Sequence, residues 1–118
     1  MKRVGEGLIT LRCVAEGELR IVKSPKDVIE LWKEGAERKI VLVEDAGVTT
    51  LGPILPKLAG VVCTSGGLGS HLAIVSREFS IPALMGTRID GLCLDEINRK
   101  RAIIRPCDGS RGELLILE

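Results

Sequence analysis

The middle of the chain contains a strand, a glycine-rich turn, a helix and a second strand in succession, and this order constrains the fold more than any other feature. Residues 60–64 have the composition of a buried strand, three glycines follow within residues 66–69, and residues 70–79 carry apolar side chains at helical spacing. Pro82 disfavours helix at the preceding residue, so the chain should extend into a strand near residues 83–85. The succession predicts parallel strands joined by a right-handed crossover, and therefore an α/β fold.

The only histidine of the chain, His71, stands where this turn passes into the helix. Gly66, Gly67 and Gly69 allow close approach to the backbone, so several N–H groups can point into one concavity. Ser70 is a favoured N-cap residue, and the first turn of the helix adds unpaired amides. A neutral imidazole keeps a lone pair for nucleophilic attack. These residues favour a phosphate cradle beside a nucleophile, although a lone histidine at a helix start is more often a capping or packing residue.

A longer pattern extends this motif. Residues 66–83 have the sequence GGLGSHLAIVSREFSIPA, which resembles the signature of the phosphohistidine, or mobile swivelling, domain of phosphoenolpyruvate-utilising enzymes. That family includes pyruvate phosphate dikinase, phosphoenolpyruvate synthase and enzyme I of the sugar phosphotransferase system. Its pattern is approximately T-x-x-G-G-x-x-S-H-x-A-I-V-A-R-E-x-x-I-P-A. This chain departs from the pattern at Cys63, in place of threonine, and at Gly69, where a hydroxyl residue is common, so two candidate phosphate ligands are missing.

The resemblance implies a three-layer β/β/α swivelling phosphohistidine domain that covers residues 1–118 as a single unit. In the family the histidine is phosphorylated and the domain moves between two active sites. By resemblance, His71 would accept and donate a phosphoryl group, and Gly66, Gly67, Gly69 and Ser70 would cradle it.

The same resemblance implies that the chain acts with partners. Relatives join this domain to an ATP-grasp nucleotide domain, to a phosphoenolpyruvate-binding barrel, or to both, and neither fits in 118 residues. We therefore expect a nucleotide-binding or a phosphoenolpyruvate- or pyruvate-binding protein to act in trans. The chain alone should bind no cofactor and no metal, and Mg²⁺ with ATP or phosphoenolpyruvate is expected on the partner.

Composition argues against several other classes of protein. Lys and Arg total 17 against 16 for Asp and Glu, and the aromatic residues are one Trp and one Phe, so nucleic acid and membrane partners are not expected. No apolar run approaches the length of a membrane span, which predicts a soluble, cytoplasmic protein. No C-x-x-C pair occurs, so free thiols are expected rather than a zinc site, and Cys63 should be a small buried side chain. The four cysteines are Cys13, Cys63, Cys93 and Cys107.

Local signals predict further elements along the chain. Ser24 and Pro25 indicate the start of a helix whose buried stripe is expected to include Trp32. In the helix after the glycine turn, Leu72, Val75 and Phe79 should be buried. The remaining expected elements are a hairpin in residues 7–22, a strand at 39–44, a short helix from Thr49 or Thr50 to residue 58, strands at 92–94 and 102–104, and a closing hairpin around the D-G-x-x-G run at 108–112.

Three weaker interpretations stay open from the residues alone. Arg77 and Glu78 are expected to form structural ion pairs rather than to contact phosphate, and residues 98–101 to form a solvated turn rather than a partner contact. The chain could instead be a regulatory or assembly module that binds a phosphorylated ligand without carrying phosphate. It could also be the small subunit of a two-chain enzyme with a dehydratase-type swivelling domain, which the Ser-His-x-Ala-Ile-Val run disfavours.

Overall fold

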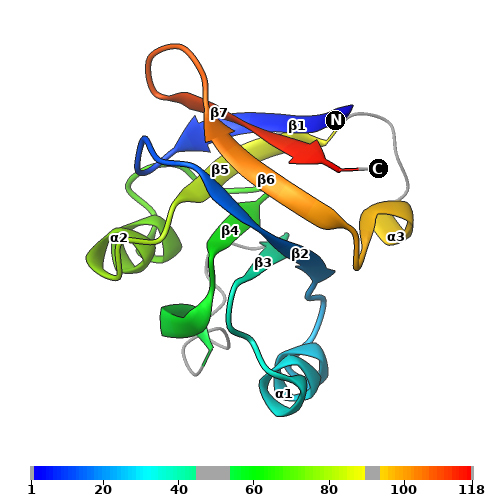
Figure 1. Ribbon diagram of the computed structural model, residues 1–118. Coiled ribbons are helices and arrows are strands. Elements are labelled where there is room, and N and C mark those ends of the chain that lie inside the picture. Colours follow the sequence, from blue (N-terminus) through cyan, green and yellow to red (C-terminus); the bar gives the residue numbers. More distant parts are fainter. Residues whose placement is uncertain (1, 45–53, 90–93, 118) are drawn as a thin grey trace.

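The computed structural model of the chain describes residues 2–44, 54–89 and 94–117. The strands in these ranges are β1 (Lys2–Ile9), β2 (Ala15–Ile21), β3 (Lys39–Val43), β4 (Gly60–Cys63), β5 (Ala83–Ile89), β6 (Arg101–Pro106) and β7 (Arg111–Ile116). The helices are α1 (Pro25–Glu34), α2 (His71–Glu78), the short α3 (Leu94–Ile97) and the 3-10 turn η2 (Leu55–Lys57). Hydrogen bonds join the strands in the order β1-β5-β4-β3-β2-β6-β7 and close them into a barrel (Figure 1).

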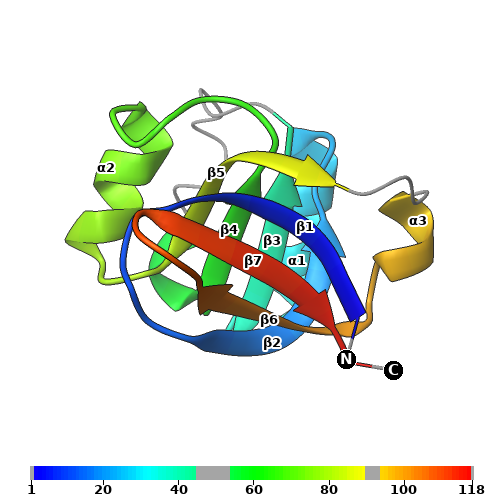
Figure 2. The ribbon, with the colours of Figure 1, turned by 90° about the horizontal axis from the view of Figure 1, so that it is seen from above.

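The barrel has a parallel part and an antiparallel part. Strands β2, β3, β4 and β5 run parallel to one another. Strand β1 is antiparallel to β5 and β7, and β6 is antiparallel to β2 and β7. In Figure 1, α1 and α2 lie on the side of β3 and β4, away from β1 and β7. Figure 2 shows β1 and β7 crossing in front of β3 and β4. The helices therefore cover the parallel part.

Two apolar cores lie on the two sides of the parallel strands. In β3, Val41 and Val43 belong to the core under the helices, whereas Ile40 and Leu42 belong to the core inside the barrel. All four side chains are essentially inaccessible to solvent. Successive residues of a strand point to opposite faces, so a continuous apolar run is what a strand covered on both faces requires. The run that predicts a buried strand at 39–44 is thus confirmed as β3.

The expected α/β class is confirmed. The expected β/β/α arrangement has two separate β layers, whereas the strands here form one closed barrel. Strand β1 bonds to both β5 and β7, and β2 bonds to both β3 and β6, so the hydrogen bonding is continuous around a closed barrel. The strand–turn–helix–strand unit is present as β4, α2 and β5, with Val61 opposite Ala83 and Val62 opposite Leu84 in a parallel ladder. The hairpin expected around residues 108–112 is present between β6 and β7.

The prediction of a hairpin in residues 7–22 is wrong. Strands β1 and β2 exist, but neither is a bonded neighbour of the other in the barrel. The segment after β1 bonds instead to the start of β5, since Thr10 N donates to Ala83 O at 3.0 Å and Thr10 Oγ1 accepts from Ala83 N at 3.0 Å. Alternating apolar residues identified the strands, but alternation within a strand does not specify its partner, and β1 pairs with β5 and β7.

Several expected burial and strand assignments are also corrected. Trp32 is 57% exposed, because α1 buries Val28 and Leu31 and turns the next residue away from the core. Phe79 is 50% exposed and lies just past α2 as its C-cap, whereas the residues that α2 buries are Leu72, Ala73 and Ser76. Leu94 begins a helix rather than ending a strand. The helix expected from Thr49 or Thr50 begins outside the described residues, and η2 is the part of it that the structure describes as helical. Most of the strand expected at 92–94 also lies outside the described residues.

No helix in the described ranges is long and apolar enough to cross a membrane.

Candidate functional site

His71 is the first residue of α2, and its side chain is exposed. Ser70 is the N-cap with extended backbone angles, φ −70° and ψ 159°, and its Oγ accepts a hydrogen bond from Ala73 N at 3.3 Å. Ser70 O accepts from Ile74 N at 3.0 Å, so the helix is bonded from its first turn. Both the helix start and the capping role predicted for Ser70 are present. The position gives His71 the positive end of the helix dipole.

The turn before α2 is anchored to two neighbouring strands. It leaves the carboxyl end of β4, where Thr64 N donates to Val43 O at 3.1 Å and Thr64 Oγ1 donates to Glu44 O at 3.3 Å. On its other side, Ser65 O accepts from Gly86 N in β5 at 3.2 Å. The carboxyl end of parallel strands is the usual ligand side of an open α/β sheet. The path of the turn is therefore set by the carboxyl end of β3 and the middle of β5.

Two glycines have a conformational reason to be there. Gly66 has φ +76° and Gly86 has φ +58°, the left-handed region that favours glycine. A Cβ on Gly86 would also lie 3.1 Å from Gly66 O. Gly67 has neither feature, because its φ is not positive and a Cβ there would meet nothing within 4 Å. Gly67 is therefore not strained by its backbone conformation, and the glycine of the turn with a left-handed conformation is Gly66.

The turn also leaves backbone donors available. No hydrogen bond within the described ranges uses the N–H of Gly67 or Gly69, whereas Gly67 O accepts from Ser70 N at 3.0 Å. Gly66 and Gly69 are exposed, and a Cβ on Gly69 would meet nothing within 4 Å. Open space beside unpaired amides is what an incoming oxyanion needs. The predicted site residues thus lie on one continuous segment that ends at His71.

The side chains around this segment divide into buried and exposed groups. Cys63 is fully buried, as expected for a small apolar side chain, and its Sγ lies 3.8 Å from Ser65 Oγ. Ile74 is 48% exposed and lies one turn after His71. The structural ion pairs expected for Arg77 and Glu78 are not seen, because neither side chain forms one with any described residue. The exposed face of α2 is therefore not occupied by salt bridges.

The described residues contain no cluster of three or more His, Cys, Asp or Glu side chains able to hold a metal ion.

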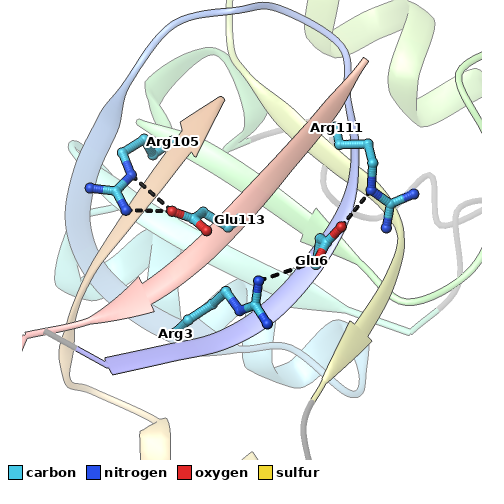
Figure 3. Close-up of polar contacts among 5 residues, drawn as sticks. All are labelled: Arg3, Glu6, Arg105, Arg111 and Glu113. Atoms are coloured by element: carbon cyan, nitrogen blue, oxygen red, sulfur yellow. Dashed lines mark hydrogen bonds and ion pairs between the residues drawn. The ribbon is translucent and has the colours of Figure 1, made fainter. Parts of the chain in front are cut away.

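A second polar feature of the surface could not be predicted from the sequence. Arginines on β1, β5 and β7 line a groove of about 480 Å³ that reaches Gly86. Arg3, Arg88 and Arg111 are far apart in the sequence, and the closing of the barrel brings them together. Figure 3 shows Arg3 and Arg111 on either side of Glu6. No local motif could have revealed this group, because its members share no spacing.

Comparison with known proteins agrees with this geometry. Residues 35–98, which include β4, the glycine turn and α2, match the family described as PEP-utilising enzyme, mobile domain. The chain belongs to this family. Similar proteins include the phosphoenolpyruvate synthase of Aquifex aeolicus, 36% identical over 84% of this chain, and the phosphoenolpyruvate-dependent phosphotransferase system of Salmonella typhimurium, 38% identical over 68%. The pyruvate, phosphate dikinase of Rhizobium meliloti is 29% identical over 95% of the chain.

In these relatives the mobile domain is a small part of a longer protein. The match covers 11% of the Aquifex protein, 10% of the Salmonella protein and 13% of the Rhizobium protein. Among solved structures, muramoyltetrapeptide carboxypeptidase from Oxalobacter formigenes superposes with a TM-score of 0.55 and 15% identity over all of this chain and 51% of that one. At this identity the likeness extends to the fold alone.

Proposed function

We propose that this mobile domain carries a phosphoryl group on His71 between active sites that lie on other domains or other chains. The observation that carries the proposal is the position of His71, exposed at the first residue of a capped helix. It directly follows a turn in which the N–H groups of Gly67 and Gly69 have no hydrogen-bond partner among the described residues. An exposed nucleophile suits a carrier, because donor and acceptor must each reach the same nitrogen. Membership of the mobile-domain family supports the same function.

In the proposed transfer, a neutral imidazole nitrogen of His71 attacks the phosphorus of the donor. A P–N bond forms, the P–O bond to the leaving group breaks, and the leaving group departs on the donor's side. Such transition states carry charge on the equatorial phosphate oxygens, and positioning with charge stabilisation does most of the work. The N–H groups of Gly66, Gly67 and Gly69 and the start of α2 at Ser70 would supply that stabilisation. The reverse steps return the group to an acceptor.

The proposal places the rest of the chemistry on a partner. We expect residues 1–118 to hold no cofactor, and Mg²⁺ with ATP or phosphoenolpyruvate to sit on a nucleotide-binding or phosphoenolpyruvate-binding domain or chain. The two cores on either side of the parallel strands support the finer expectation of a three-layer β/β/α swivelling domain, with the helices as one layer. Residues 1–118 would then form one such domain.

The test is labelling of the purified 118-residue chain. Incubation with labelled ATP or phosphoenolpyruvate and Mg²⁺ should give no labelling by itself, and addition of a nucleotide-binding or phosphoenolpyruvate-binding partner from the same cell should label His71. Because the bond is P–N, the label should be lost in acid and retained in alkali. Label that persists in His71→Ala, or alkali-labile label on Ser70, would contradict the proposal, as would full phosphorylation without a partner.

One observation favours a second candidate, a module that binds a phosphorylated ligand without carrying phosphate covalently. Cys63 is buried and Gly69 has no hydroxyl, so neither supplies the phosphate ligand expected at its position, and the Ser70 hydroxyl is already bonded to Ala73 N. Saturable phosphate binding that shifts the amide signals of residues 66–71, with no labelling by any donor–partner pair, would favour this candidate.

A further inference from the structure

The arginine-lined groove lies on the outer surface of three adjacent strands. Strand β1 is the centre of the three, with β5 on one side and β7 on the other. In these ladders Glu6 is opposite Arg88, and Leu8 is opposite Arg111. Arg3 precedes Glu6 on β1. The groove lined by these residues of the three strands has a volume of about 480 Å³. This volume falls in the range of small-molecule sites, about 300–1,000 Å³.

One carboxylate holds two of the three arginines in place. Arg3 Nη1 lies 3.4 Å from Glu6 Oε2, and Arg111 Nε donates to Glu6 Oε1, as Figure 3 shows. A guanidinium has five N–H donors, so each of these arginines keeps donors that Glu6 does not use. Arg88 is exposed and forms no ion pair with any described residue.

The described residues that line the groove do not balance its charge. Three arginines face one carboxylate among them, which leaves two positive charges. The adjacent Glu113 brings its own cation, because Arg105 Nε donates to Glu113 Oε1 at 2.9 Å (Figure 3). The charge of Arg3 also acts on Glu113, but this second ion pair adds as much positive as negative charge and leaves the excess unchanged. An ion-pair network that served stability alone would not need Arg88, which lacks a partner in the described part of the chain.

The backbone leaves room for a ligand and connects the groove to the turn before His71. Gly7 and Gly86 line the groove and carry no side chains that would fill it. Gly86 N donates to Ser65 O at 3.2 Å, so the groove borders the glycine turn. A ligand held here would thus lie on the surface next to the His71 segment without using the amides of that segment.

We propose that this groove is a second anion site, which binds a phosphate group of a small molecule. A phosphate dianion matches the two positive charges that the described lining leaves uncompensated, and its oxygens can accept N–H donors from three directions at once. Arginine forks suit such tetrahedral oxyanions, since each offers two parallel donors. An acidic segment of another protein would meet the same charge, but a groove of bounded volume with convergent arginines fits one compact dianion better. The site does not depend on His71 carrying phosphate.

The test is titration of the isotope-labelled chain with inorganic phosphate and with pyrophosphate, followed by amide NMR at constant ionic strength. Saturable shifts are expected at Gly7, Gly86 and Arg88, and they should persist in His71→Ala. Arg88→Gln should weaken pyrophosphate binding about tenfold. Lys33→Gln removes the same charge from an exposed position on α1 and should leave pyrophosphate binding unchanged.

Further variants and ligands distinguish phosphate binding in the groove from binding at the glycine turn and from protein docking. Arg88→Lys keeps the charge but loses the fork, so an affinity between those of the wild type and Arg88→Gln would support recognition by the guanidinium. The native amide spectrum of each variant controls for folding. Equal affinity in Arg88→Gln and Lys33→Gln, or shifts confined to residues 66–71, would overturn the proposal. Tighter binding of an acidic peptide than of pyrophosphate would also overturn it, in favour of a protein-docking surface.

Discussion

At the scale of single residues, the turn before His71 separates glycines that the backbone requires from glycines that only leave space. Gly66 has a positive φ, whereas Gly67 and Gly69 have open space where a Cβ would stand. The sequence shows three equivalent glycines and no way to distinguish them. Their different roles follow from how Ser65 and Gly86 fix the path of the turn, which is a contact between distant residues.

Gly66→Ala is therefore expected to lower the free energy of unfolding by about 1–2 kcal/mol, the usual cost of a left-handed conformation for an L-residue. Gly67→Ala should change it by less than about 0.5 kcal/mol, because nothing crowds that position. Chemical denaturation of both variants measures the difference. Equal destabilisation by the two substitutions would show that the turn relaxes and that its conformation is not fixed.

Gly67 has a different expected role, in phosphate binding. Its unpaired N–H and its open surroundings place it where an oxyanion would sit, so a branched side chain would obstruct the ligand rather than strain the fold. Gly67→Val should reduce labelling of His71 about tenfold while unfolding stays cooperative. Labelling equal to that of the wild type would show that the turn serves only as a connection between β4 and α2.

At the scale of elements, the helix that carries His71 depends on its cap. Ser70 Oγ accepts from Ala73 N, one of the amides that has no partner within the helix. Ser70→Ala should cost about 1 kcal/mol of stability, and Ser70→Asn should retain most of it, because asparagine is an equally good N-cap. Denaturation midpoints of the two variants test this. If both variants lose the same stability, the contribution of Ser70 lies elsewhere than in the cap.

The elements that the sequence could predict are those with local signals. Pro25 at the first turn of α1, Ser70 before α2 and the apolar run of β3 each specify an element from a few adjacent residues. Pairing between strands that are distant in the sequence could not be predicted in this way. The predicted hairpin is absent because β1 pairs with β5 and β7. Trp32 is exposed, contrary to the prediction, because helical spacing does not tell how wide the buried stripe of a helix is. The arginine groove depends wholly on such distant pairing.

At the scale of the whole molecule, an ion pair joins α1 to the barrel. Arg20 on β2 is mostly buried, and its Nη1 lies 2.5 Å from Glu34 Oε2 at the end of α1 and 3.3 Å from Glu18 Oε1. Burial disfavours the charged form of Arg20, but the hydrogen bonds and charges of Glu34 and Glu18 outweigh it and raise its pKa. The hydrogen bond and charge of Arg20 in turn lower the pKa of Glu34 below its ordinary value of 4.5.

A carboxyl group whose pKa is lower in the folded state stabilises the fold above its unfolded pKa, and this contribution disappears as the pH falls through the folded pKa. Glu34→Gln should therefore lower the denaturation midpoint at pH 7, and its difference from the wild type should shrink as the pH falls below about 4.5. Glu30→Gln on the same helix is the matched control, because Glu30 is exposed and has no ion pair in the described ranges, so its midpoint should follow the wild type. A Glu34→Gln deficit that is equally large at acid and neutral pH would show that packing, rather than the ion pair with Arg20, joins α1 to the barrel.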